Sequence, residues 1–416
     1  MKFDTIIIGG GLSGLVCGVY LQKSGRKCAI VSAGQNALNF SSGSFGFLSR
    51  LPDGTDVSEP LKVMDSLSGD HPYKKMGSEK VEAYAGKVKS FFADCGIPLH
   101  GDYRKNSYML TPTGEMKPTW LSMEDITMFP SKDTKIGNKA LIVNLLGYLD
   151  FNTGFIADGL EKRGTACRIA DVKLDSIEKL RRNPTEMRAV NIARVMDNES
   201  ERNKFVSAVK GLVRDEDVVV IPAVFGLKDK TAVAQIRADI GVDTCFAGTM
   251  PPSIPGVRAQ MQLKSVFDEA GGDFLMGDEA KYPEMKDGKV VSIRTENLGN
   301  VKLEADEFVL ASGSFFAKGL VSTPNRIYEP VFDLDVEYDK DRNKWYDPQF
   351  FNKQNYMGYG VITDSSFKAV KGGKVIDNLF VIGSVLSGMN ALYEFCGAGV
   401  SIMTAMSVAD SILGRQ

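Results

Sequence analysis

A glycine-rich turn near the start of the chain has the residue types and spacing that bind a pyrophosphate. Gly9-Gly10-Gly11-Leu12-Ser13-Gly14 fits the pattern G-x-G-x-x-G. Gly9 permits a tight turn, Gly11 lets the backbone approach the phosphates, and Gly14 lets the next helix pack closely on the preceding strand. The start of that helix offers free N–H groups and the positive end of its dipole. We therefore expect a dinucleotide phosphate site at this turn.

The residues around the turn predict the strand–turn–helix–strand unit that this chemistry requires. Residues 5–8 form a β-branched run typical of a buried parallel strand, and apolar residues then follow the turn at helical spacing. Residues 27–32 predict a second strand, which ends at Ser32. An Asp or Glu at that end usually binds the ribose hydroxyls of the adenosine. Ser32 can hydrogen-bond a hydroxyl but carries no charge, so the nucleotide stays open.

Four further short segments are candidates for cofactor contacts. Ser42-Gly43-Ser44 lies in a Ser/Gly-rich loop that can present backbone N–H groups, although a plain turn is an equal alternative. Ala311-Ser312-Gly313 follows a strand-like run, and Gly383-Ser384 follows another. Gly397-Ala398-Gly399 opens a final helix, whose N-terminal dipole favours negative charge on a bound ring.

Composition limits the classes of function. The chain has 416 residues, 43% hydrophobic and 25% charged, with a net charge of −2, so a basic nucleic-acid-binding surface is not expected. The six cysteines (Cys17, Cys28, Cys95, Cys167, Cys245 and Cys396) form no C-x-x-C pair and are interpreted as reduced, mostly buried thiols, with no metal site. The two histidines, His71 and His100, lie in loop-like stretches and are expected to be exposed. We expect neither a signal peptide nor a transmembrane segment; the apolar run 395–409 predicts a buried helix.

The order of elements predicts an α/β fold in which one Rossmann-like domain carries an inserted α/β substrate or cap domain. Residues 1–50, 251–330 and 371–416 are assigned to the Rossmann-like domain, 51–250 to the insertion, and 331–370 to an irregular joining segment. Within the insertion, strand-like and helical runs alternate over 139–248 and predict a parallel α/β subdomain. One of its helices is expected over 184–197, with Asn183 as N-cap and Pro184 in its first turn.

Several longer motifs resemble a known family. IIIGGGLSG, FVLASGS and LFVIGS resemble the flavoproteins with two dinucleotide-binding domains. FSSGSFGFLSRLPDG, TPTGE, TWLS, NPTEMRAVNIARVMDNE, MPPSIPGVR and ASGSFFAKGLV resemble the B subunit of bacterial anaerobic glycerol-3-phosphate dehydrogenase. The resemblance extends over nearly the whole chain and makes the Rossmann-like domain a flavin-binding domain.

The resemblance implies an activity, a cofactor and partners. The family oxidises sn-glycerol 3-phosphate to dihydroxyacetone phosphate and passes electrons toward quinone, with fumarate or nitrate as terminal acceptor. The A and B subunits form the catalytic dimer, and an iron–sulfur C subunit attaches this cytoplasmic dimer peripherally to the inner membrane. The family implies FMN for the B subunit, whereas the G-x-G-x-x-G turn also allows FAD.

A phosphate-bearing substrate requires basic side chains. We select Arg188, Arg258 and Arg326 as candidates, with Arg194 on the same helix as Arg188, and identify no general base. Two alternatives to direct oxidation remain. The chain can be an electron-relay and docking subunit without substrate chemistry of its own, or a flavin reductase using NAD(P)H. The lack of a second G-x-G-x-x-G turn counts against the reductase.

Overall fold

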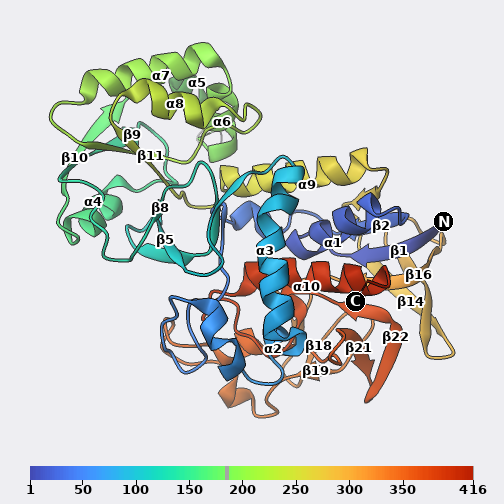
Figure 1. Cartoon of the computed structure of the whole chain (residues 1–416). Helices are drawn as coiled ribbons and strands as arrows, with labels where there is room; N and C mark the ends of the chain where they lie inside the picture. The colour runs from blue at the N-terminus through green and yellow to red at the C-terminus, as the bar shows by residue number, and fades with distance from the viewer. Residues whose placement is uncertain (183–186, 416) are drawn as a thin grey trace.

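The computed structural model describes residues 1–182 and 187–415. Figure 1 shows two lobes, with both chain termini in the first lobe and the middle of the chain in the second. A mixed eight-stranded sheet forms the centre of the first lobe, and a four-stranded parallel sheet forms that of the second. The fold therefore has the α/β class and the inserted domain that the sequence predicts.

The large sheet has the order β13-β2-β1-β16-β15-β14, with β22 beside the end of β16 and β21 beside β22. Its strands are β1 Lys2–Ile8, β2 Cys28–Ser32, β13 Asp273–Met276, β14 Ala280–Lys286, β15 Lys289–Thr295, β16 Leu303–Leu310, β21 Lys368–Lys371 and β22 Lys374–Val381. β13, β2, β1, β16 and β22 run parallel, and Ile8 pairs with both Val31 and Leu310. The carboxyl ends of these strands therefore meet at one edge, where parallel sheets bind ligands.

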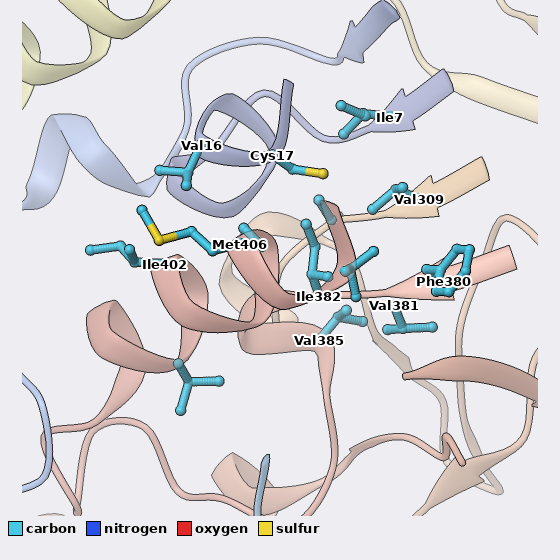
Figure 2. Packing of buried hydrophobic residues seen from close by; sticks show 14 of the residues in the cluster. Ile7, Val16, Cys17, Val309, Phe380, Val381, Ile382, Val385, Ile402 and Met406 are labelled. Atoms are coloured by element: carbon cyan, nitrogen blue, oxygen red, sulfur yellow. The ribbon is translucent and has the colours of Figure 1, made fainter. Parts of the chain in front are cut away.

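The first and last helices of the chain pack against each other on this sheet. They are α1 Leu12–Lys23 and α10 Gly397–Ile412. Val16 of α1 lies beside Ile402 and Met406 of α10, and Cys17 of α1 points toward Val309 of the sheet (Figure 2). All five side chains are fully or almost fully buried, so apolar burial holds the two ends of the chain together. The buried helix expected near the C-terminus is confirmed.

The segment after β2 extends the core of the first lobe. It comprises η1 Ala37–Phe40, β3 Ser44–Phe45, η2 Pro60–Ser66, α2 Pro72–Met76, α3 Ser78–Asp94, β4 Leu99–Gly101 and β7 Leu121–Met123. Val81, Val88 and Phe92 form an apolar stripe of α3 that is buried in the same hydrophobic cluster as α1 and α10. The expected start of the insertion at residue 51 is therefore too early, because α3 needs the first lobe to cover its apolar face.

The later part of the chain also packs on the first lobe. Its elements are α9 Ile254–Glu269, η4 Phe315–Ala317, β17 Val321–Ser322, β18 Ile327–Tyr328, β19 Val336–Glu337, η5 Arg342–Lys344, η6 Asn355–Gly358, β20 Gly360–Val361 and η7 Gly383–Val385. Leu334, Trp345 and Val361 are buried in the first hydrophobic cluster. The segment 331–370 is thus irregular, as expected, but it belongs to the first lobe rather than joining two domains.

The second lobe contains the parallel subdomain that the sequence predicts. Its sheet has the order β10-β9-β11-β12, and every pair is parallel. The strands are β9 Lys139–Leu145, β10 Ala166–Val172, β11 Val218–Pro222 and β12 Asp243–Ala247; the helices are α4 Thr153–Glu161, α5 Asp175–Leu180, α6 Ala189–Met196, α7 Glu199–Leu212 and α8 Ala232–Ile240. The helix expected from residue 184 begins at Ala189, and its expected cap at Asn183 and Pro184 lies outside the described residues.

A small antiparallel sheet connects the two lobes. It has the order β6-β5-β8, with β5 Ser107–Leu110, β6 Met116–Thr119 and β8 Met128–Phe129. Met109, Leu110 and Met116 are buried in the second hydrophobic cluster. Within residues 1–182 and 187–415, no helix is both long and apolar enough to cross a bilayer.

Candidate functional site

A cavity of about 570 Å³ lies at the carboxyl edge of the large sheet. Its volume falls within the range of about 300–1,000 Å³ that is usual for ligand and cofactor sites. The walls come from the glycine turn before α1, the segments after β2, β13 and β16, and the start of α10. Segments from both ends of the chain therefore enclose one site.

The three glycines at the pattern positions of the turn, Gly9, Gly11 and Gly14, have different structural roles. Gly9 has φ of +122°, and a Cβ there would lie 2.1 Å from the Ala311 carbonyl oxygen. A Cβ at Gly14 would lie 1.9 Å from the Gly9 carbonyl oxygen, so Gly14 allows α1 to approach the turn. A Cβ at Gly11 would meet only Asn36, at 3.9 Å, and Gly11 lines the cavity. Close backbone approach by a phosphate is therefore possible at Gly11.

One buried hydroxyl in the cavity wall needs a partner. Ser312 Oγ is buried and has no hydrogen-bond partner within the described structure. Buried polar atoms are rarely left unpaired in native proteins. Together with the open space at Gly11, this orphaned hydroxyl fits a ligand rich in oxygen and nitrogen atoms, such as a flavin nucleotide.

The end of the cavity near β2 carries a carboxylate that the sequence pattern did not reveal. Ser32 is buried, and its hydroxyl donates to the Gly34 carbonyl at 3.3 Å. Asp278 lies close by, but its carboxylate accepts from the Thr295 hydroxyl and the Asn297 N–H. Glu279 also lines the cavity, and its carboxylate is half exposed. The acid absent from the end of β2 is thus available from the neighbouring strand connection.

The start of α10 forms another part of the cavity wall. Gly397 and Ala398 line the cavity, whereas the Gly399 N–H donates to the Gly46 carbonyl at 2.8 Å. The first N–H groups of a helix have no partner within the helix and carry the positive end of its dipole. The site therefore presents positive potential at the start of α10. Of the three residues predicted there, Gly397 and Ala398 line the cavity and Gly399 does not.

Twelve of the predicted cofactor residues line the cavity. They are Gly9, Gly10, Gly11, Leu12, Ser13, Ser32, Ala311, Ser312, Gly313, Ser384, Gly397 and Ala398. Six do not: Gly14, Ser42, Gly43, Ser44, Gly383 and Gly399.

Close packing and side-chain contacts explain why five of these six residues do not reach the cavity. Gly14, Gly383 and Gly399 allow close packing, and Cβ atoms at the last two would meet Ser13 Oγ at 2.5 Å and Tyr73 Oη at 2.2 Å. The Ser42 hydroxyl instead contacts Ser44 Oγ at 2.8 Å and Met109 Sδ at 3.4 Å.

Sequence reasoning missed the segments on either side of the glycine turn. The loop after β2 and the segment around η4 contribute residues 33–38, 314 and 316–318 to the lining. Asn36 Nδ2 donates to the Gly10 carbonyl at 2.6 Å and fixes that loop against the turn. Ser41 and Phe45 line the cavity on either side of the predicted Ser42-Gly43-Ser44. No periodic pattern marks such loop residues, because tertiary hydrogen bonds position them.

The expectation that His71 is exposed is wrong. His71 is 1% exposed, and its Nδ1 accepts from the Tyr73 N–H at 3.1 Å. The Nε2 atom lies 3.2 Å from Glu394 Oε2. Cys396 Sγ lies 3.8 Å from the same oxygen. Burial raises the pKa of the Cys396 thiol, and the Glu394 carboxylate raises it further.

His71, Glu394 and Cys396 form a buried cluster next to the start of α10, whose N-cap is Cys396. The ligand atoms of His71, Glu394 and Cys396 lie within 4.8 Å of one another. Glu394 Oε1 accepts from the Asn390 N–H, and Oε2 faces both His71 and Cys396. His100, in β4, is also partly buried rather than exposed, and burial lowers its pKa. Neither histidine lines the cavity.

The predicted substrate arginines lie away from the cavity and already have partners. Arg258 donates to Asp125 at 2.6 Å and to the Gly226 carbonyl at 2.7 Å. Arg188 pairs with Asp150 at 3.3 Å, and Arg326 lies 3.6 Å from Asp333. Arg194 donates to Asn191 at 3.2 Å. The arginine predictions therefore find no support in the geometry.

Comparison with known proteins places this geometry in a family context. The FAD binding domain family matches residues 4–400. The B subunit of the anaerobic glycerol-3-phosphate dehydrogenase of Yersinia enterocolitica is 40% identical over 99% of this chain and 98% of its own. The protein of the same name from Pectobacterium carotovorum is 40% identical over 99% of both chains. A solved 3-ketosteroid delta1-dehydrogenase from Sterolibacterium denitrificans is 9% identical, covers 99% of both chains and has a TM-score of 0.46.

Proposed function

The chain belongs to the FAD binding domain family and to the family of anaerobic glycerol-3-phosphate dehydrogenase B subunits, and on this premise we propose that it oxidises sn-glycerol 3-phosphate to dihydroxyacetone phosphate. It is a flavin-dependent oxidoreductase component of a multi-subunit enzyme. The observation that carries the proposal is that one cavity is lined by both the phosphate-type turn before α1 and the N-terminus of α10.

We propose FAD as the flavin in this cavity. Ser32 and Glu279 line the cavity after β2 and β13, Gly11 lines it after β1, which lies next to β2 in the sheet, and Gly397 and Ala398 line it at the start of α10. A dinucleotide uses all three regions: the ribose at the first, the pyrophosphate at Gly11 and the ring at the helix start. The proposed ligands are Gly9, Gly10, Gly11, Leu12, Ser13, Ser32, Glu279, Ala311, Ser312, Gly313, Ser384, Gly397 and Ala398.

The identity of the flavin is tested by extraction. The purified chain is denatured, and the released flavin is separated by chromatography and compared with FAD and FMN standards. We expect FAD in about equimolar amount with protein. Release of FMN would contradict the proposal that the region near Ser32 and Glu279 binds the adenosine ribose, because FMN has no adenosine.

The protein contributes positioning and positive potential to the reaction. When held by these residues, a flavin would supply the acceptor for the hydride of the substrate's carbinol carbon. The N–H groups of Gly397 and Ala398 and the dipole of α10 favour negative charge at this end of the cavity. Phe45 lines the same cavity and gives it an apolar wall.

Anaerobic spectroscopy tests the activity. Glycerol 3-phosphate is added to the flavin-loaded chain without oxygen, and the flavin absorbance is followed. We expect bleaching with glycerol 3-phosphate and none with glycerol at the same concentration. A flavin that stays oxidised both in the isolated chain and in the A–B dimer would refute the proposed oxidation.

A relay role is the second candidate function. It is favoured by the position of the histidines, since His71 is engaged by Glu394 and Tyr73 and neither His71 nor His100 reaches the cavity. In a relay, the A subunit oxidises the substrate and this chain receives the electrons. Bleaching that occurs only after the A subunit is added would support the relay, whereas bleaching of the chain alone supports direct oxidation.

The proposed partners are the catalytic A subunit, an iron–sulfur C subunit and, indirectly, quinone. In this arrangement the C subunit attaches a cytoplasmic A–B dimer peripherally to the inner membrane. Fractionation of cells that express or lack the C subunit tests the attachment. We expect this chain in the membrane fraction only when the C subunit is present.

A further inference from the structure

The β5–β6 hairpin carries a lysine that has no ionic partner in the described structure. Lys117 lies in the middle of β6 and is only partly exposed. None of the ion pairs of the described residues includes it, whereas Arg188, Arg258 and Arg326 each face a carboxylate. Burial lowers the pKa of the Lys117 ammonium, and no charged neighbour opposes the shift. A desolvated cation without a counter-charge is unfavourable unless an anion joins it.

The strand register shows which way this lysine faces. Lys117 pairs with Met109 across the antiparallel β5–β6 ladder, so the two side chains lie on the same face. Met109 Sδ contacts the Ser42 hydroxyl at 3.4 Å. Thr119, two residues after Lys117, shares that face, and its hydroxyl donates to the Phe45 carbonyl at 3.2 Å. The loop 42–45 therefore covers the face that carries Lys117.

The same loop borders the ring end of the flavin cavity. Phe45 lines the cavity, and the next residue, Gly46, accepts a hydrogen bond from the Gly399 N–H in the first turn of α10. The proposed flavin ring lies against Gly397 and Ala398 of that turn. A substrate whose carbinol carbon reaches the ring from the hairpin side would have its far end near Lys117.

We propose that the Lys117 ammonium, assisted by the hydroxyls of Ser42 and Ser44, binds the phosphate monoester dianion of the substrate. The two hydroxyls lie 2.8 Å apart and on the side of the loop that contacts Met109. Lysine and serine donors together suit the oxygens of a phosphate. The inference rests on the proposed function, because the phosphate belongs to the molecule oxidised at the ring. Lys117 then replaces the predicted arginines as the phosphate-binding residue.

Binding measurements on the flavin-loaded A–B dimer test the site. Dissociation constants for dihydroxyacetone phosphate and inorganic phosphate are obtained from the perturbation of the flavin absorbance. We expect Lys117→Gln to weaken both by about 10- to 100-fold, the range for loss of a charged hydrogen bond, while flavin content stays unchanged. Lys117→Arg should retain most of the affinity. Lys105→Gln, at an exposed lysine next to the same hairpin, should behave like the wild type.

Lysine acetylation footprinting tests the site in the wild-type A–B dimer, so it does not depend on whether a variant folds. Lysines are acetylated with and without glycerol 3-phosphate, and mass spectrometry gives the rate at each position. We expect glycerol 3-phosphate to slow acetylation of Lys117 but not of Lys105. Equal rates at Lys117 with and without ligand would overturn the proposal.

The outcomes separate this inference from the proposed function. If the wild type is bleached by glycerol 3-phosphate and Lys117→Gln binds and reacts equally well, the phosphate site is wrong and the oxidation stands. If Lys117 is protected but the flavin is never bleached, the phosphate site is supported and only the oxidation on this chain fails.

Discussion

The open space beside Gly11 allows a phosphate to approach the backbone of the turn before α1. Since a Cβ at Gly11 meets nothing closer than 3.9 Å, Gly11→Val should leave the fold intact and fill the cavity instead. We expect the flavin-to-protein ratio of the purified variant to fall at least about tenfold, as a displaced phosphate group costs more than about 1.4 kcal/mol.

Gly211→Ala is the matched control for this change. Gly211 lies in α7 of the second lobe, and a Cβ there meets nothing within 4 Å. It should keep the wild-type flavin content. Full flavin retention by Gly11→Val would show that the phosphates do not lie at this turn.

Thiol reactivity tests the environment of Cys396 and the other cysteines. Burial raises the pKa of Cys28 to about 12 and that of Cys167 to about 11, and it raises the pKa of Cys17 and Cys396 well above the usual value. Because the thiolate is the nucleophile, iodoacetamide at pH 8 should label these residues slowly in the folded chain. All six cysteines should react in denaturant. Rapid labelling of Cys396 in the native protein would contradict its burial at the N-cap of α10.

At the scale of elements, the start of α10 depends on the space at Gly399. A Cβ there would lie 2.2 Å from Tyr73 Oη, whose hydroxyl donates to the Phe47 carbonyl at 2.9 Å. Gly399→Ala should therefore destabilise the protein by about 1–3 kcal/mol, the usual cost of overpacking. Thermal or urea unfolding measures the change.

A second substitution distinguishes this clash from general helix strain. Tyr73→Phe removes the clashing oxygen, so the double variant should be more stable than the sum of the two single changes predicts. Strict additivity would mean that Tyr73 does not touch the helix start.

In the second lobe, one ion pair links β10 to the segment before β11. Arg168 Nε lies 2.6 Å from Glu216 Oε1, and this partner lowers the pKa of the Glu216 carboxyl to about 2. A depressed carboxyl pKa adds stability above the unfolded value of 4.5. That contribution, up to about 3 kcal/mol, is lost as the pH falls from 4.5 toward 2.

Hydrogen exchange of peptides from β10 and β11 tests the pair. Glu216→Gln should raise exchange in these peptides at pH 6 and make less difference as the pH approaches 3. The exposed pair of Asp158, in α4, and Lys162, at the C-cap of α4, provides the control, since Asp158→Asn should change exchange little at either pH. An equal effect of Glu216→Gln at both pH values would rule out the ion pair as the cause.

The elements that the sequence predicted well are those with a local pattern. The alternation of strand-like and helical runs over 139–248 correctly predicted four parallel strands. The glycine turn that begins at Gly9 follows β1 and leads into α1, as expected. The Ser42-Gly43-Ser44 prediction failed to place these residues in the cavity because β7 sets their register. The Met123 N–H donates to the Gly43 carbonyl and the Trp120 N–H to that of Phe45. Such partners lie far along the chain and leave no local signal.

Burial of isolated polar residues was equally hidden from the sequence. His71 lies in a segment that has the composition of a loop, and its burial depends on Glu394 near the opposite end of the chain. Glu279 reaches the ribose end of the cavity because β13 pairs with β2. That Lys117 lacks a charged partner can be seen only in the folded hairpin, where the strand register decides which side chains face it.

At the scale of the whole molecule, the fold brings the two ends of the chain to one ligand. α1 and α10 share a buried core, and both helix starts line the same cavity. The sequence predicted this meeting from the glycine turns, but it placed the start of the insertion at residue 51. The sequence does not show which element covers the apolar stripe of α3. In the structure this stripe is buried in the same cluster as α10, so the first lobe extends beyond the predicted boundary at residue 51.

Removal of the flavin should therefore weaken the first lobe selectively. Ligand at a hundredfold excess over its dissociation constant stabilises the folded state by about 2.7 kcal/mol. We expect the flavin-free chain to unfold at lower temperature and FAD to restore the loss. Hydrogen exchange should increase near Gly11 and Gly397 and remain unchanged in β9 and β10. An equal increase in both lobes would contradict a site confined to the first lobe.

A crystal structure of the flavin-loaded chain is the most direct test that the opening turn and the closing helix hold one flavin. We predict density for the phosphates within hydrogen-bond distance of Gly11 and Leu12, and density for the ring against Gly397 and Ala398. Flavin density elsewhere, or a ring that does not reach α10, would contradict the proposed site.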